Sequence, residues 1–168
     1  MRSGLSYSAE PAEEERELED VYLKLLTLIE RLHRQLLDVI KDELDRVGQT
    51  NINAVQALLL YNIGDAELTA GELRSRGHYL GSNVSYNLKK LVESGYISHK
   101  RSSADRRSVR VSLTPAGFEI RERLAGLFDR HLDSVEKVGD VSVTMVETTI
   151  LTLDGLERFW ADQIRFQL

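Results

Sequence analysis

TAGELRSRGHYLGSNVSYNLKKLVESGYISHKRSSADRRSVRVSLT, residues 69–114, differs in charge from the rest of the 168-residue chain. This stretch holds nine Lys or Arg residues and three acidic residues, a net charge of +6. The remainder holds 13 basic and 24 acidic residues, a net charge of −11. A basic segment set in an acidic protein is typical of a nucleic-acid-binding surface, because phosphate contacts depend on the local charge of one face.

The spacing of residues in this stretch predicts a short helix, a turn and a second helix. Thr69 and Glu72 form a T-x-x-E capping pattern that starts the first helix, which Gly77 ends. The second helix is expected from Ser82 to Glu93. Its buried stripe is predicted to be Val84, Leu88, Leu91 and Val92.

The other face of the second helix carries hydrogen-bonding and cationic side chains. These are Ser82, Asn83, Ser85, Tyr86, Lys89 and Lys90. A helix with such a face fits the DNA major groove, where polar side chains reach base edges and lysines reach phosphates. An ordinary solvated surface is the alternative, but it usually mixes both charge signs, and no acid precedes Glu93 in this helix. We therefore predict a recognition helix.

A β-hairpin is expected after this helix. Residues 109–113 alternate strictly between apolar and polar, as a half-buried strand does. The tip and flanks of the hairpin carry the cations Lys100, Arg101, Arg106 and Arg107. A narrow basic hairpin can lay arginines on the DNA backbone or in the minor groove. Asp105 is expected to orient one of the two tip guanidiniums, and the sequence leaves open whether that is Arg106 or Arg107.

Long apolar helices are predicted on both sides of this region, over residues 13–48 and 115–168. Apolar residues recur with helical spacing for more than seven turns of the first of these helices. The C-terminal helix is rich in aromatic and aliphatic side chains, which must be covered. We expect both regions to form a dimer; a central core helix in a monomer is the alternative for the first. Residues 1–12 are expected to be a disordered tail, and residues 49–114 the DNA-binding lobe.

The order of these elements and the hairpin pattern resemble the MarR family of winged-helix transcription regulators. The most specific similarity lies in residues 91–97 (LVESGYI), 105–107 (DRR) and 111–117 (VSLTPAG). The resemblance covers nearly the whole chain, from Asp20 to Phe166. It implies a mainly α fold with a small β-hairpin, in which a winged helix-turn-helix lobe joins long N- and C-terminal dimerisation helices.

The resemblance also implies partners. It implies a homodimer whose two lobes read the halves of a palindromic operator in double-stranded DNA. It further implies a pocket between the dimerisation helices and the lobe for a small amphipathic or aromatic effector. The candidates for this pocket are polar and aromatic residues of three helices. They are Thr27, Arg31 and His33 of the helix over residues 13–48, Tyr61 of the helix that follows it, and Phe118 of the helix that starts after Thr114. Core packing is the alternative role for Tyr61 and Phe118.

Composition excludes several other functions. The absence of cysteine excludes a disulfide framework, a thiolate zinc site and cysteine-based oxidant sensing. The four histidines lack metal-ligand spacing, and no apolar run approaches the roughly 20 residues that span a bilayer. We expect a cytoplasmic protein without cofactor or metal, and no enzyme, since no catalytic motif is found. The competing interpretation is a winged-helix module that dimerises and binds proteins without binding DNA.

Overall fold

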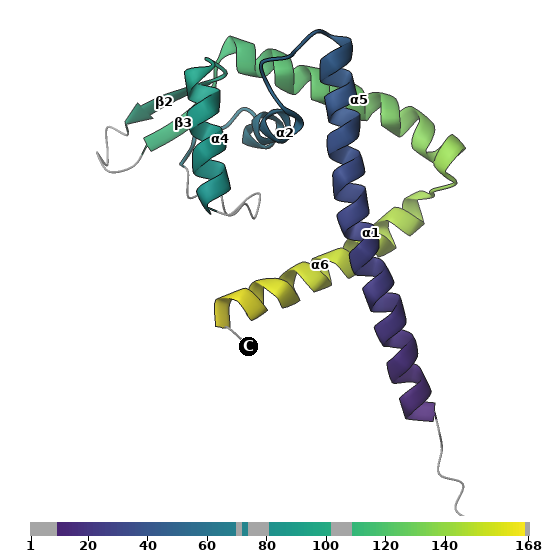
Figure 1. Ribbon diagram of the computed structural model, residues 1–168. Coiled ribbons are helices and arrows are strands. Elements are labelled where there is room, and N and C mark those ends of the chain that lie inside the picture. Colours follow the sequence, from purple (N-terminus) through teal and green to yellow (C-terminus); the bar gives the residue numbers. More distant parts are fainter. Residues whose placement is uncertain (1–9, 70–71, 74–80, 102–108, 167–168) are drawn as a thin grey trace, which may run out of the picture. The chain divides into compact units, whose positions relative to one another are not determined.

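The computed structural model describes residues 10–69, 72–73, 81–101 and 109–166. The chain forms two compact units, residues 1–121 and 122–168, and helix α5 continues from one into the other. Of the predicted short helix, Glu72 and Leu73 are helical; the rest of it and the hairpin tip lie outside the described residues. In the first unit, α2 and α4 lie beside the strands β2 and β3 (Figure 1).

The first helix, α1 (Glu10–Arg46), starts three residues earlier than the sequence predicted. Its second residue is Pro11, which is tolerated in a first turn because the N–H groups there have no helical partner. Residues 10–12 are therefore helical, and the rest of the expected tail lies outside the described residues. Near its C-terminal end α1 buries Ile40 and Leu44 and contacts α2.

The second helix, α2 (Ala54–Ile63), begins at the capping residue Asn53. The Asn53 side chain accepts a hydrogen bond from the Gln56 N–H at 2.9 Å, and the Gln56 side chain accepts one from the Asn53 N–H at 3.2 Å. The same reciprocal pattern joins Thr69 and Glu72, at 3.1 and 2.6 Å. Both pairs stabilise a helix start, and the one at Thr69 is the start that the sequence predicted.

The wing is part of a three-stranded antiparallel sheet with the order β1-β3-β2. The sheet consists of β1 (Leu68–Thr69), β2 (Ile97–Arg101) and β3 (Val109–Leu113), and the wing is its hairpin of β2 and β3. The predicted hairpin pairs Ile97 with Leu113 and Arg101 with Val109. The sequence did not predict β1, because two residues are too few to show an alternation. The helix α4 (Gly81–Glu93) contacts β2.

A compact junction joins α4, β2, β3 and α5 (Pro115–Gly139). The Thr114 hydroxyl donates a hydrogen bond to the Gly95 carbonyl at 2.7 Å, and the Thr114 N–H donates one to the Tyr96 carbonyl at 3.0 Å. The same hydroxyl accepts a hydrogen bond from the Gly117 N–H at 3.2 Å, which caps α5. Gly117 is buried against the Tyr96 carbonyl, and a Cβ at this position would overlap that oxygen.

The second unit contains the remainder of α5 and the helix α6 (Val143–Phe166). The Ser142 hydroxyl accepts a hydrogen bond from the Met145 N–H at 3.3 Å, as expected for a helix start. None of the described residues of α6 is buried within the single chain. Among the helices that the structure describes, none has the length and apolar character needed to cross a membrane.

We predict that Gly117→Ala destabilises the protein by about 1–3 kcal/mol, because the added methyl group forces the Tyr96 carbonyl to move. Gly126→Ala is the matched control in the same helix. A Cβ at Gly126 would only meet the Arg130 guanidinium at 3.7 Å, and alanine is the better helix former, so this variant should gain up to about 1 kcal/mol. Urea unfolding of both variants measures the difference; equal stabilities would contradict the close approach at Gly117.

Candidate DNA-binding surface

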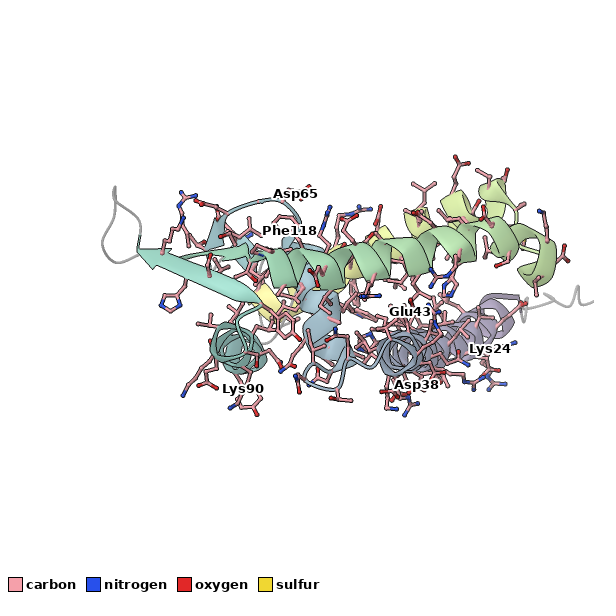
Figure 2. The ribbon with its side chains drawn as sticks, turned by 90° about the horizontal axis from the view of Figure 1, so that it is seen from above. Lys24, Asp38, Glu43, Asp65, Lys90 and Phe118 are labelled. Carbon is pink, nitrogen blue, oxygen red and sulfur yellow. The ribbon has the colours of Figure 1, made fainter. Side chains whose placement is uncertain are left out.

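The two faces of α4 differ as the sequence predicted, where they are described. Leu88 and Leu91 are buried, with 8% and 1% of their surface exposed. Tyr86 and Lys90 are exposed on the opposite side, and Ser85 and Lys89 are exposed on the flank that faces the wing. Tyr86 alone exposes 62% of a large aromatic side chain. Lys90 projects from α4 away from the strands (Figure 2). The helix therefore combines a packed face with a polar, cationic face that is open to a macromolecular partner.

Several predicted contact residues are placed only in part. Ser82 and Asn83 belong to the first turn of α4 and Arg101 to the end of β2, but the structure does not describe their side chains. Arg106 and Arg107 lie outside the described residues. Their assignment to DNA contacts stays a prediction.

Both lysines of α4 share one carboxylate. The Lys90 ammonium lies 3.0 Å from one oxygen of Glu93, and the Lys89 ammonium lies 3.8 Å from the other. The hydrogen bond from Lys90 is the main reason that the pKa of Glu93 lies below its usual value, and the charges of both lysines add to it. The same hydrogen bond raises the pKa of Lys90. The carboxylate of Glu93 and the ammonium group of Lys90 are therefore charged at neutral pH.

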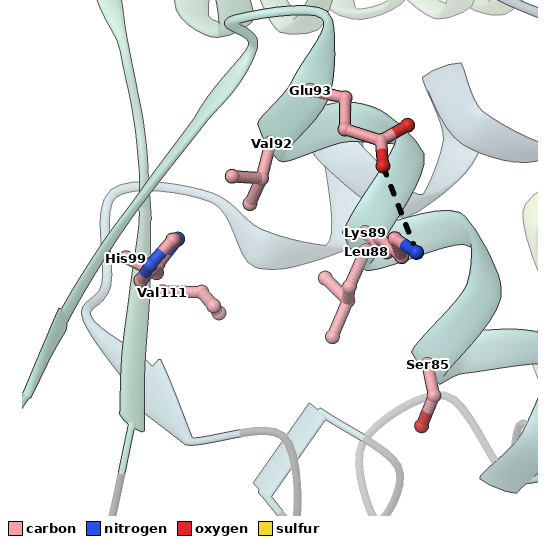
Figure 3. Close-up of a pocket in the computed structure, with 7 residues that line it drawn as sticks. All are labelled: Ser85, Leu88, Lys89, Val92, Glu93, His99 and Val111. Atoms are coloured by element: carbon pink, nitrogen blue, oxygen red, sulfur yellow. Dashed lines mark ion pairs between the residues drawn. The ribbon is translucent and has the colours of Figure 1, made fainter.

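A groove of about 480 Å³ separates α4 from the wing (Figure 3). Leu88 and Val92 of α4 face Val111 of β3 across its floor, and His99 of β2 lies at the strand side. Ser85, Lys89 and Glu93 complete the lining from α4. An apolar floor with a few polar groups at its edge suits a small amphipathic molecule.

The other face of the wing carries a pair of cations. Lys100 and Arg110 are directly opposite each other on β2 and β3, and both are exposed. Side chains alternate along a strand, so this pair lies on the face opposite to His99 and Val111 of the groove. Like charges in cross-strand positions repel each other unless an anion lies between them. Arg110 was not among the predicted contact residues, although its polar position in the alternation and its place opposite Lys100 pointed to it.

The five residues predicted for an effector pocket do not all gather in one place. Thr27 and Arg31 line a pocket of about 220 Å³ on α1, together with Lys24 and Leu28. His33 is exposed on the same helix and is not among the residues that line this pocket. Tyr61 is half-buried on α2, and Phe118, in the first turns of α5, exposes 36% of its surface.

Comparison with known proteins supports the fold and the kind of site. Residues 52–117 match the model of the winged helix DNA-binding domain family. The exopolysaccharide II synthesis transcriptional activator ExpG of Rhizobium meliloti (strain 1021) is 38% identical over 151 residues, which cover 86% of this chain and 74% of ExpG. Streptococcus pneumoniae FabT in complex with DNA is 25% identical, with a TM-score of 0.63 over 84% of this chain and 98% of FabT. Staphylococcus aureus MarR in complex with salicylate and kanamycin is 21% identical, with a TM-score of 0.68 over 88% of this chain and 97% of that protein.

The winged-helix core, with its open cationic helix and basic wing, defines a DNA-binding transcription regulator. Within that class the chain belongs to the MarR family of winged-helix regulators, as the pattern in residues 91–117 indicated. Membership of this family favours DNA binding over the competing interpretation, a winged-helix module that binds only proteins.

Proposed function

We propose that the chain acts as a homodimer that binds a palindromic site in double-stranded DNA, with α4 of each copy in the major groove. The observation that carries this proposal is the division of α4 into two faces, with Leu88 and Leu91 buried and the polar side exposed. Ser82, Asn83, Ser85 and Tyr86 would contact base edges. Lys89, Lys90, Lys100 and Arg101 would contact phosphates, together with Arg106 or Arg107.

The two faces of the wing suggest how it meets DNA. Lys100 and Arg110 repel each other in the free protein, and a phosphate between them would remove that repulsion. We therefore add Arg110 to the residues proposed to contact the DNA backbone.

We predict that Arg106→Ala or Arg107→Ala weakens binding to the DNA site and flattens its salt dependence, because each lost phosphate contact lowers the slope of log K against log salt by about 1. DNA fragments selected with the purified protein from its source genome would supply the site. A gel-shift titration over a series of salt concentrations measures both effects. Unchanged affinity and slope in both variants would rule out the wing as a DNA contact, and failure to enrich any palindrome would rule out the proposed mode of binding.

The apolar surfaces of α1 and α6 support the homodimer. Exposed apolar residues on α6 recur at steps of three, four or seven residues, at Val143, Val146, Ile150, Leu153, Trp160 and Ile164. Leu18, Val21, Leu28 and Leu32 follow the same steps on α1 and are also exposed. Such a repeat forms a stripe that packs against another helix. A soluble chain rarely leaves surfaces of this size in water, so a second copy of the chain is the expected cover.

We predict that Ile150→Glu converts the dimer to a monomer, because it places a charge in the middle of the α6 stripe. Ile150 is half exposed in the single chain, so the same change should leave the lobe of residues 49–114 folded. Light scattering coupled to size exclusion measures the mass, and circular dichroism checks the fold. Ile150→Leu keeps the volume and should remain dimeric; a dimer with Ile150→Glu would place the interface elsewhere.

We further propose that a small amphipathic or aromatic acid lowers the affinity for DNA by binding in the groove beside α4. Its volume of about 480 Å³ lies within the usual range for ligand sites of about 300–1,000 Å³, whereas the α1 pocket that Thr27 and Arg31 line, at about 220 Å³, lies below it. Lys89 and His99 are placed to meet a carboxylate at the groove's edge while the apolar floor receives the ring. A ligand held there would occupy space between two elements that meet DNA, and so would bind the DNA-free state better.

We predict that millimolar salicylate raises the Kd for the selected DNA site and that His99→Ala removes most of this response. Arg31→Ala is the control, because it changes the α1 pocket instead of the groove. Fluorescence anisotropy with labelled DNA gives the Kd with and without salicylate. If Arg31→Ala removes the response and His99→Ala does not, the effector binds in the α1 pocket, which Thr27 and Arg31 line, as the sequence predicted.

A further inference from the structure

Glu93 occupies an unusual position for an acid. It lies in the last turn of the helix proposed to enter the major groove, and it is half exposed there. A negative charge at a helix C-terminus is unfavourable, because the carbonyl groups at that end already carry partial negative charge. A negative charge on a DNA-binding helix also repels phosphates. An acid at this position therefore favours neither the stability of α4 nor its proposed binding to DNA.

The two ion pairs of Glu93 do not explain its position through helix stability either. Lys89 and Lys90 precede Glu93 by four and three residues. This order, with the lysine nearer the N-terminus, is the weaker of the two possible orders for pairs on a helix. All three side chains are substantially exposed, and exposed pairs of this kind contribute little to stability. The pairs do, however, involve both of the lysines on the DNA-facing side of α4.

We propose that Glu93 limits the affinity of this surface for DNA of any sequence by holding Lys89 and Lys90 in the free protein. Each oxygen of the carboxylate faces one ammonium group, at 3.8 and 3.0 Å. When DNA binds, phosphates take the lysines from the carboxylate, and the unpaired negative charge of Glu93 remains close to the backbone. Both the exchange and the repulsion reduce the electrostatic part of the binding free energy, which does not depend on sequence. This inference rests on the proposed role of α4 in DNA binding.

Such a limit has a use for a regulator. Contacts with phosphates give affinity for every stretch of DNA, and a genome offers very many competing sites. Lower affinity for all of them leaves more of the protein free to find a specific site. Glu93 would therefore reduce the time spent on random DNA without altering any contact with a base.

We predict that Glu93→Gln binds a duplex with the selected site and a random duplex of equal length more tightly, each by roughly three- to tenfold at physiological salt. The slope of log K against log salt should steepen by about 1 in both cases, since one opposing charge is removed. Fluorescence anisotropy in a series of KCl concentrations measures affinity and slope together. The gain should be smaller when the Glu93→Gln, Lys89→Ala, Lys90→Ala triple variant is compared with the Lys89→Ala, Lys90→Ala double variant, because only the repulsion by Glu93 is left to be removed there.

Asp45→Asn is the matched control. Asp45 pairs with Lys41 at 2.7 Å on α1, and this exposed pair is also four residues apart with the lysine first. The variant makes the same change in net charge and should leave affinity and slope unchanged. An equal gain with Asp45→Asn would assign the effect to net charge alone, and a gain on the selected site but not on random DNA would make Glu93 a base-reading residue; either result overturns the inference. So does unchanged binding by Glu93→Gln in a protein whose wild type binds the site, whereas a wild type that binds no DNA overturns the proposed function itself.

Discussion

The junction between Gly95, Tyr96 and Thr114 fixes how the wing and α4 lie relative to each other. The Tyr96 N–H donates a hydrogen bond to the Leu91 carbonyl at 2.9 Å, so the strand β2 leaves the last turn of α4 in a fixed direction. Thr114, at the end of β3, then bonds to the carbonyls of both Gly95 and Tyr96. Gly95 makes this turn with a φ of 77°, a conformation that glycine adopts without strain. These hydrogen bonds fix the geometry of the groove and the orientation of the polar side of α4.

This junction explains why the family pattern was readable in the sequence. The residues that gave the most specific resemblance, LVESGYI and VSLTPAG, include the ends of α4 and β3 that meet there. Gly117 belongs to the same pattern because a side chain at that position would overlap the Tyr96 carbonyl. The sequence pattern that identifies the family therefore reflects the backbone geometry of the junction. Residues that face DNA are under no such constraint, which is why the pattern identified the family but not the operator.

Sequence reasoning predicted the elements whose side-chain period is long enough to measure. The buried side of α4, the two strands of the hairpin and the cap at Thr69 all follow from local patterns. It missed β1, which has two residues, and the start of α1 at Glu10, which lies within the expected tail. It assigned Lys100 to the hairpin but to neither of its faces; the register sets Lys100 opposite Arg110, on the face away from His99 and Val111. The periodicity of side chains along a helix or strand assigns a residue to one face, but only the tertiary structure shows which element packs against that face.

The partners of the individual charges in residues 69–114 matter more than the net charge of the segment. Of the three acids in residues 69–114, Glu72 caps a helix and Glu93 holds two lysines, so neither merely dilutes the positive charge. Cations on α4 are paired within the protein, whereas Lys100 and Arg110 on the wing face each other as like charges. In the proposed complex, phosphates would therefore compete with Glu93 for the lysines of α4 but would relieve the repulsion between the two cations of the wing. The free energy of phosphate contacts should consequently come mainly from the wing, which leaves α4 to discriminate between sequences.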